Sequence, residues 1–101
     1  MRILVMLNPT NQRGTKMNYT AFRKFLISDG YQRIGTELFM RVSNNRKSME
    51  KHLKRMEEYN PGTGTIRIIK MTEKQYENIR YLTGEPDAQE IIVGANCHIS
   101  L

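Results

Sequence analysis

Five consecutive apolar residues near the start of the chain, from Ile3 to Leu7, limit the possible folds more than any other feature of the sequence. Side chains alternate between the two faces of a β-strand, so three of the five point to one face and two to the other. A strand that is apolar on both faces is typical of the interior of a sheet. We therefore expect residues 2–7 to form a strand with neighbours on both sides.

Helical and extended patterns alternate along the rest of the chain. Asp29 and Gly30 end the first helical pattern, and a segment rich in Pro and Gly, residues 60–64, ends the second. Thr72 and Gln75 have the spacing of a capping box, which opens a third, short helix. In chain order the expected elements are a helix over 17–28, two strands within 31–42 that meet near Gly35 and Thr36, a helix from a Ser43–Asn45 cap to 59, a strand over 65–71, a short helix ending near Arg80 and a last strand over 90–93.

This order of strand, helix, strand, strand, helix and strand is that of a ferredoxin-like α+β sandwich, βαββαβ, with an additional C-terminal short helix and strand. We expect one such domain over residues 1–94 and a C-terminal tail over 95–101. Two helices cover only one face of a four-stranded sheet. Because Leu4 and Met6 give the other face apolar character, we expect a second copy of the chain to cover it, which predicts a homodimer.

Positive charge is concentrated in the first half of the chain. Twelve Lys or Arg and three acidic residues up to Met56 give a net charge of +9, whereas four basic and seven acidic residues from Glu57 onward give −3. This polarity predicts a basic surface for a polyanion, with nucleic acid as the expected partner and simple solvation of the surface as the alternative. The sequence shows no signal peptide and no apolar run long enough for a membrane span, so we expect a cytoplasmic protein without a membrane partner.

Several motifs point to one family when they are taken together. An apolar first strand ending in Asn8 and Pro9 is followed by Tyr19-Thr-Ala-Phe-Arg-Lys-Phe-Leu26, Asp29-Gly-Tyr31 and Leu38-Phe-Met-Arg-Val42. A later block, Thr72-Glu-Lys-Gln-Tyr76, leads to Tyr81-Leu-Thr-Gly84. In this order and spacing the chain resembles CRISPR-associated protein two, in particular the members from single-effector (type II) systems, over about residues 1–94.

The resemblance implies a role in antiviral defence, as a non-sequence-specific nucleic-acid-binding adaptor of spacer acquisition. It implies a homodimer of ferredoxin-like subunits in which the last strand adds to the partner's sheet. Such a dimer bridges two dimers of the integrase, CRISPR-associated protein one, and holds duplex DNA before its insertion into the CRISPR array. Other acquisition proteins are further expected partners. The alternative activity in the family is that of a Mg²⁺-dependent endonuclease acting on RNA or DNA, and toxin-like or regulatory proteins share the fold.

Position 8 departs from the family pattern. The family carries a metal-binding Asp at the end of the first strand, paired across the dimer axis, whereas this chain carries Asn8. An amide offers Mg²⁺ a dipolar oxygen in place of a full negative charge. We therefore assign no catalytic residue and expect no cofactor, with Mg²⁺ expected only if the family's nuclease activity is retained. Glu37, at the junction of two expected strands, is an alternative carboxylate for a metal, and a surface or dimer-rim position is the other interpretation.

Four basic residues are the candidate nucleic-acid contacts. Arg13 and Lys16 flank a Gly-Thr pair in a polar loop, where exposed backbone amides add hydrogen-bond donors for phosphate. The similar loop of family members contacts the DNA backbone. Arg23 and Lys24 directly follow Phe22 and so leave the buried face of their helix. They are expected to reach phosphate or the integrase, with simple surface solvation as the alternative.

Overall fold

The structure, a computed structural model, describes residues 1–10 and 15–85, with the backbone alone for 15–17. The elements expected up to residue 80 are all present, although the third helix ends at Glu77 and not near Arg80. The expected strand over 90–93 and the boundary between a domain over 1–94 and a tail over 95–101 lie outside the described residues. The elements are β1 (Arg2–Asn8), α1 (Thr15–Ser28), β2 (Gln32–Gly35), β3 (Leu38–Val42), α2 (Arg46–Glu58), β4 (Thr65–Met71) and α3 (Glu73–Glu77).

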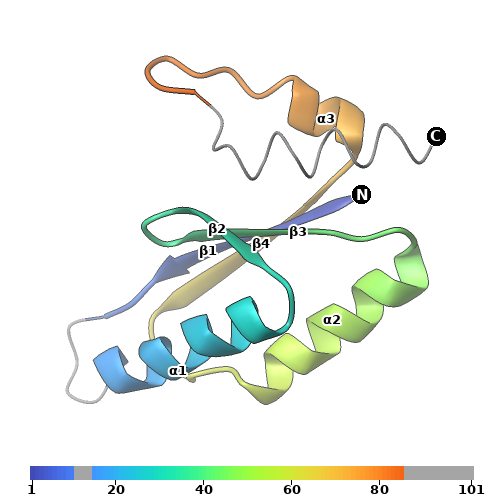
Figure 1. Cartoon of the computed structure of the whole chain (residues 1–101). Helices are drawn as coiled ribbons and strands as arrows, with labels where there is room; N and C mark the ends of the chain where they lie inside the picture. The colour runs from blue at the N-terminus through green and yellow to red at the C-terminus, as the bar shows by residue number, and fades with distance from the viewer. Residues whose placement is uncertain (11–14, 86–101) are drawn as a thin grey trace.

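The four strands form one antiparallel sheet in the order β2-β3-β1-β4. β1 lies between β3 and β4, as its two apolar faces predict. α1 and α2 cover one face of the sheet, and α3 lies on the opposite side (Figure 1). The architecture is the α+β, ferredoxin-like arrangement expected from the order of elements. Among the described residues, no helix is long and apolar enough to cross a membrane.

The core lies between the sheet and the two long helices. Alternate residues of β1 face the helices, and residues three or four apart on each helix form the stripe that meets them. Asn45 caps α2 through its side chain, which accepts a hydrogen bond of 2.8 Å from the Ser48 N–H, and Gly30 ends α1 at a φ of 93°. The principal buried residues are Ile3, Val5, Leu7, Tyr19, Phe22, Leu26, Phe39, Met49 and Met56.

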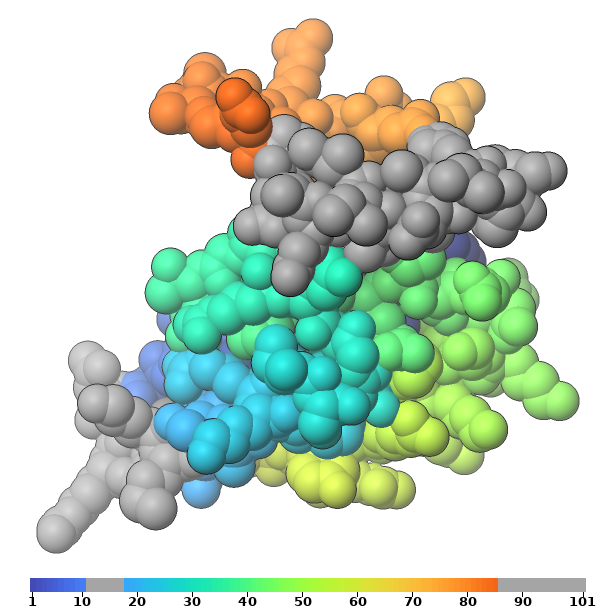
Figure 2. Space-filling view, viewed as in Figure 1, coloured from blue at the N-terminus to red at the C-terminus, as the bar shows by residue number. Residues whose placement is uncertain are grey.

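The other face of the sheet is partly covered by the chain itself. Leu4 and Met40 lie on this face and are 6% and 1% exposed, whereas Met6 is 39% exposed. α3 and the residues that follow it enclose a hollow of about 320 Å³ against the sheet. In Figure 2 these residues form the orange layer above the sheet. Apolar side chains from both sides line the hollow, namely Leu4, Ile34 and Leu38 from the sheet and Tyr76, Ile79 and Tyr81 from the later segment.

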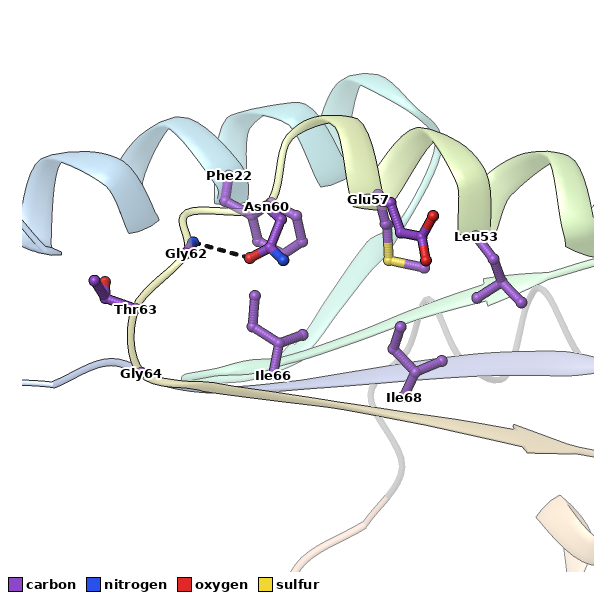
Figure 3. A pocket seen from close by; sticks show the side chains of 10 residues that line it. Phe22, Leu53, Glu57, Asn60, Gly62, Thr63, Gly64, Ile66 and Ile68 are labelled. Atoms are coloured by element: carbon purple, nitrogen blue, oxygen red, sulfur yellow. Dashed lines mark hydrogen bonds between the residues drawn. The ribbon is translucent and has the colours of Figure 1, made fainter.

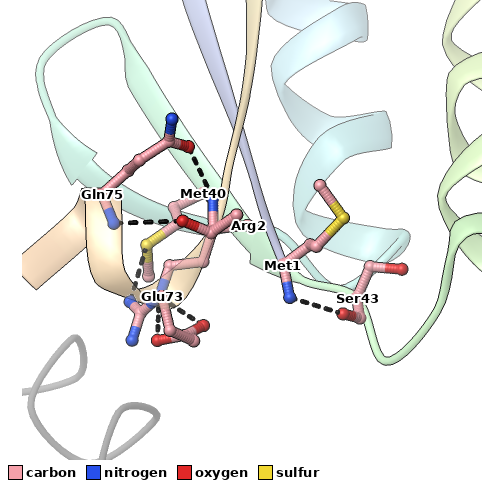
Figure 4. Close-up of polar contacts among 7 residues, drawn as sticks. Met1, Arg2, Met40, Ser43, Glu73 and Gln75 are labelled. Carbon is pink, nitrogen blue, oxygen red and sulfur yellow. Dashed lines mark hydrogen bonds and ion pairs between the residues drawn. The ribbon is translucent and has the colours of Figure 1, made fainter.

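A buried arginine anchors α3 to this face (Figure 4). Arg2 is 2% exposed, and its Nε–H donates to both carboxylate oxygens of Glu73 at 3.0 and 3.1 Å. Its guanidinium carbon lies 3.7 Å from the centroid of the Tyr76 ring, within range of a cation–π interaction. The expected capping box is confirmed, because the Thr72 hydroxyl accepts from the Gln75 N–H and the Gln75 side chain accepts from the Thr72 N–H.

A polar cluster joins the end of α1 to α2. The Asp29 carboxylate is about as buried as a core residue, with its side chain 9% exposed. One of its oxygens lies 2.9 Å from His52 Nδ1, and the other accepts a hydrogen bond of 2.7 Å from Arg55. The Tyr31 ring meets the His52 ring edge to face at 6.5 Å. Together these contacts fix the position of α2 relative to the strand that follows α1.

Burial raises the pKa of Tyr31 to about 12, and the nearby negative charge of Asp29 adds to the increase. Because the pKa in the folded protein lies above that of an unfolded tyrosine, this contribution to stability is complete below about pH 10 and is lost as the pH rises toward 12. We expect the wild-type protein to lose about 1 kcal/mol more than Tyr31→Phe between pH 9 and pH 11.5, by urea unfolding. Tyr59→Phe, at an exposed tyrosine, is the control for the loss of a tyrosine hydroxyl as such. If the wild type and Tyr31→Phe lose equal amounts of unfolding free energy over this pH range, the prediction is wrong.

Candidate nucleic-acid interface

Several candidate residues meet where β1 ends. Asn8 is the last residue of β1, is exposed, and pairs in register with Thr65 of β4. The turn between β2 and β3 lies beside it, since the Leu7 N–H donates to the Glu37 carbonyl at 2.9 Å. α1 begins a few residues after Asn8. The end of the sheet therefore brings together position 8, the Glu37 turn and the start of α1.

The loop that enters β4 is packed tightly against this end of the sheet. The Tyr19 hydroxyl donates to the Thr63 carbonyl at 2.5 Å. Gly64 follows with a φ of 71°, and a Cβ at this position would overlap both the Tyr19 hydroxyl and the Asn8 carbonyl oxygen. Burial raises the pKa of Tyr19, and the negative charge of Glu37 raises it further, so Tyr19 remains a hydrogen-bond donor at neutral pH.

Glu37 and Arg23 form an ion pair that the sequence analysis did not foresee. Arg23 Nη2 lies 2.7 Å from one carboxylate oxygen of Glu37, and Arg23 Nε lies 3.3 Å from the other. Both side chains are partly buried, at 23% and 28% exposed. The pair connects α1 to the turn between β2 and β3. The positive charge of Arg23 is therefore offset by Glu37 within the protein. The role of Arg23 toward phosphate stays a prediction.

The residues at this end of the sheet do not fit a divalent metal ion. Asn8 offers a neutral amide, and the Glu37 carboxylate is held by a guanidinium whose positive charge disfavours a second cation. Within residues 1–10 and 15–85, no group of three or more His, Cys, Asp or Glu is placed to hold a metal ion. His52 is 7% exposed, and its Nδ1 lies 2.9 Å from the Asp29 carboxylate. We therefore derive no chemical step through a metal in this chain.

The other predicted contacts lie on or near α1. Arg13 lies outside the described residues, and Lys16 is in the first turn of α1 with no description of its side chain. Lys16 follows Asn8, the last residue of β1, by eight residues in the chain. Lys24 is exposed farther along α1. Their contacts with phosphate stay predictions.

A second set of exposed cations lies on α2. Its buried side carries Met49, His52 and Met56, so the charged residues between them face away from the sheet. Arg55 differs from the rest because it binds Asp29. The other exposed basic residues on this helix are Arg46, Lys47, Lys51 and Lys54.

A groove of about 310 Å³, lined by both apolar and polar residues, runs between α2 and β4 (Figure 3). Leu53 and Met56 from the helix face Ile66 and Ile68 from the strand. The loop at one end of the groove is held by a hydrogen bond of 2.9 Å from the Gly62 N–H to the Asn60 side chain. In the part of the chain that the structure describes, β4 pairs with β1 alone, so its other edge has hydrogen-bonding groups open to a further strand.

Comparison with known proteins identifies the family. The profile of the family described as CRISPR associated protein Cas2 matches residues 11–79. A CRISPR-associated endoribonuclease Cas2 from Acidovorax ebreus is 35% identical over 96 residues, which cover 94% of each chain. Proteins of the same name are 34% identical in Ligilactobacillus salivarius, over 84% of this chain and 85% of the relative, and 33% identical in Streptococcus mutans, over 86% and 81%. With this coverage and the fold described above, the chain belongs to the Cas2 family.

Proposed function

We propose that this chain is a homodimeric adaptor of CRISPR spacer acquisition that binds duplex DNA without sequence specificity and bridges two dimers of the integrase, in the cytoplasm. The observation that carries the proposal is the basic first half of the chain, with a net charge of +9 up to Met56, combined with an end of the sheet that does not fit a divalent metal. A surface of this kind binds the phosphate backbone and leaves it uncut.

Two surfaces support the homodimer. The face of the sheet opposite α1 and α2 keeps exposed apolar residues, with Met6 and Ile69 both 39% exposed. The outer edge of β4 borders the groove against α2, so a strand from a second copy gains backbone hydrogen bonds there and can cover Ile66 and Ile68. Sedimentation of the purified protein tests this part of the proposal, and a monomer at micromolar concentration contradicts it.

Replacement of Arg13 and Lys16 by Glu tests the DNA contacts. In the proposal each of these cations neutralises one phosphate, so the double variant should bind a short duplex at least about 10-fold more weakly near 0.1 M salt. The slope of log affinity against log salt should become shallower by about 2. Fluorescence anisotropy with duplexes of two unrelated sequences measures both quantities.

Lys74→Glu is the matched control for this experiment. Lys74 lies on α3, at the Arg2 end of the sheet, far from Asn8. It changes the charge by −2, as Arg13→Glu or Lys16→Glu does when made alone, so it is compared with these single variants. Equal losses of affinity in Lys74→Glu and in each single variant indicate a general charge effect and contradict a specific role for Arg13 and Lys16.

The integrase tests the bridging role. Co-purification with the integrase from the same locus, followed by a spacer-integration assay with and without this subunit, should show integration that depends on the subunit. Integration that proceeds equally well without it overturns the proposal. Other acquisition proteins can be added to the same assay as further partners.

Endoribonuclease activity is the second candidate, supported by the names of the curated relatives. Purified protein is incubated with single-stranded RNA, duplex RNA and duplex DNA, with Mg²⁺ and with chelator. Our proposal expects no metal-dependent cleavage by the wild type. Cleavage that requires Mg²⁺ and is lost in Asn8→Ala or Glu37→Gln establishes the second candidate.

A further inference from the structure

The outward face of α2 carries three lysines that lie in one row. Lys47, Lys51 and Lys54 follow one another at intervals of four and three residues, which places them on the same side of the helix. All three are exposed. They border an open hollow of about 410 Å³, which Glu50 also lines. These three residues are called the lysine stripe.

The protein does not neutralise the stripe by itself. No ion pair within residues 1–10 and 15–85 involves any of its three lysines. Glu50 stands four residues before Lys54, which is the spacing of a helical ion pair, yet the two side chains form no such pair in this part of the chain. The stripe therefore keeps its positive charge for a partner from solution.

The charges at the start of α2 also oppose the dipole of the helix. Its first turn contains Arg46 and Lys47 and no acidic residue. The N-terminal end of a helix carries a partial positive charge, so cations there are destabilising and anions are stabilising. A bound anion along the stripe relieves this repulsion, whereas the free protein bears it.

We propose that the lysine stripe binds a run of phosphates in a nucleic-acid backbone, as a site separate from Arg13 and Lys16. Lys47 and Lys54 are about 10 Å apart along the helix axis. Each strand of a duplex carries one phosphate per about 3.4 Å of its axis, so the three ammonium groups can contact phosphates of one strand. The inference deepens the proposed function, since it rests on nucleic acid as the partner.

The stripe starts at the end of the sheet opposite Asn8. The segment that leads into α2 lies beside the first residue of the chain, because the Met1 amino group donates to the Ser43 carbonyl at 3.1 Å. The early part of α1 lies near Asn8, where Tyr19 is bonded to the loop that enters β4. The two helices thus begin at opposite ends of β1, which is about 20 Å long (Figure 1). A different part of the backbone, from the same duplex or from a second one, therefore occupies the stripe.

The surroundings of the stripe favour a nucleic acid over an acidic protein. Specific protein interfaces have an apolar centre in which lysine is depleted. None of the exposed large hydrophobic residues in the described part of the chain lies within α2 (Arg46–Glu58), so a protein would find no apolar centre there. A phosphate backbone needs none, because the release of counterions supplies the affinity.

Charge reversal of Lys47 and Lys51 to Glu tests the site in the full chain. Isothermal titration calorimetry with a duplex of about 30 base pairs, near 0.1 M salt, gives both the affinity and the number of duplexes bound. If one duplex reaches both sites, the double variant should bind at least about 10-fold more weakly, with a salt slope shallower by about 2. If the stripe holds a second duplex, the variant should bind fewer duplexes per protomer. Unchanged affinity together with an unchanged number of duplexes overturns the inference.

The matched control reverses Lys74 and Arg80 to Glu, with the same change of charge. Both residues are exposed, one on α3 and the other just after it. This control should change the affinity by less than about 3-fold and leave the number of bound duplexes as in the wild type. A loss equal to that of the stripe variant shows a general charge effect and overturns the inference.

Two single variants separate binding from folding. Lys47→Glu places an acid in the first turn of α2, so it should keep or raise the midpoint of urea unfolding while it weakens binding. Glu50→Gln removes a negative charge beside the stripe and should strengthen binding about 2-fold, whereas Glu85→Gln, at an exposed residue after α3, should not. Weaker binding by Glu50→Gln contradicts the proposed site.

Failure of this inference and failure of the proposed function give different results. If the stripe variant binds like the wild type while the Arg13 and Lys16 variant binds more weakly, the inference alone is wrong. If the wild type binds no nucleic acid, both are wrong. If the stripe variant keeps its binding of nucleic acid but no longer binds the integrase, the stripe is a protein-docking surface and the inference is overturned.

Discussion

Replacing Gly64 by alanine should lower the free energy of unfolding by about 3 kcal/mol. Gly64 has a φ of 71°, where a residue with a Cβ loses roughly 1 to 2 kcal/mol. The added methyl group would also overlap the Asn8 carbonyl oxygen and the Tyr19 hydroxyl. Since the carbonyl belongs to the central strand, neither side can move away without breaking the pairing of β1 with β4. Urea unfolding followed by far-UV circular dichroism measures the loss.

The same loop contains a matched control at Gly62. Its φ of 78° is similar, but a Cβ there would meet no atom within 4 Å. Gly62→Ala should therefore lose only the backbone contribution, about 1 kcal/mol. If the two variants lose equal amounts of stability, the close approach to β1 does not matter and the packing argument is wrong.

Replacing Arg2 by alanine should lower the free energy of unfolding by about 3 kcal/mol. The variant loses a buried guanidinium that donates to Glu73, lies against the Tyr76 ring and contacts the Met40 sulfur at 3.2 Å. It also removes the contact that holds α3 on the sheet. Trypsin should therefore cleave after Lys74 and Arg80 at least about 10-fold faster in the variant, because local opening of this segment becomes more favourable.

Arg67→Ala is the control for Arg2→Ala. Arg67 lies on the same face of the sheet but is exposed. Its replacement should change stability by less than about 0.5 kcal/mol and leave trypsin cleavage after Lys74 unchanged. If Arg2→Ala is cleaved rapidly but keeps the unfolding free energy of the wild type, the predicted loss of stability is wrong. In that case Arg2 anchors α3, and α3 contributes little to the stability of the core.

The elements of the fold could be predicted because their signals are local. The apolar run of β1, the glycine after α1, the Asn45 cap and the capping box at Thr72 each depend on residues close in sequence, and the structure confirms all four. The third helix ends at Glu77, before the predicted end near Arg80, because Asn78 caps it and donates its backbone N–H to the Gln75 carbonyl. The order of elements was then enough to give the sheet and to place β1 in its interior.

The contacts that define the candidate site could not be predicted in the same way. Arg23 and Glu37 are 14 residues apart, and Arg2 and Glu73 are 71 residues apart. Any exposed arginine can pair with several acids in the sequence, and only the folded sheet decides which one lies within reach. For the same reason no sequence motif includes His52, although its ring is hydrogen-bonded to the Asp29 carboxylate in the folded protein.

The interior position of β1 has a consequence for how the protein is made. Of the described elements β1 is made first, yet its two neighbours are β3 and β4, the latter being the last strand of the described sheet. Until residues 65–71 have left the ribosome, the apolar segment at the start of the chain has at most one neighbouring strand. Such an unpaired segment is prone to aggregate, so chaperone demand during translation should be highest for chains truncated before β4.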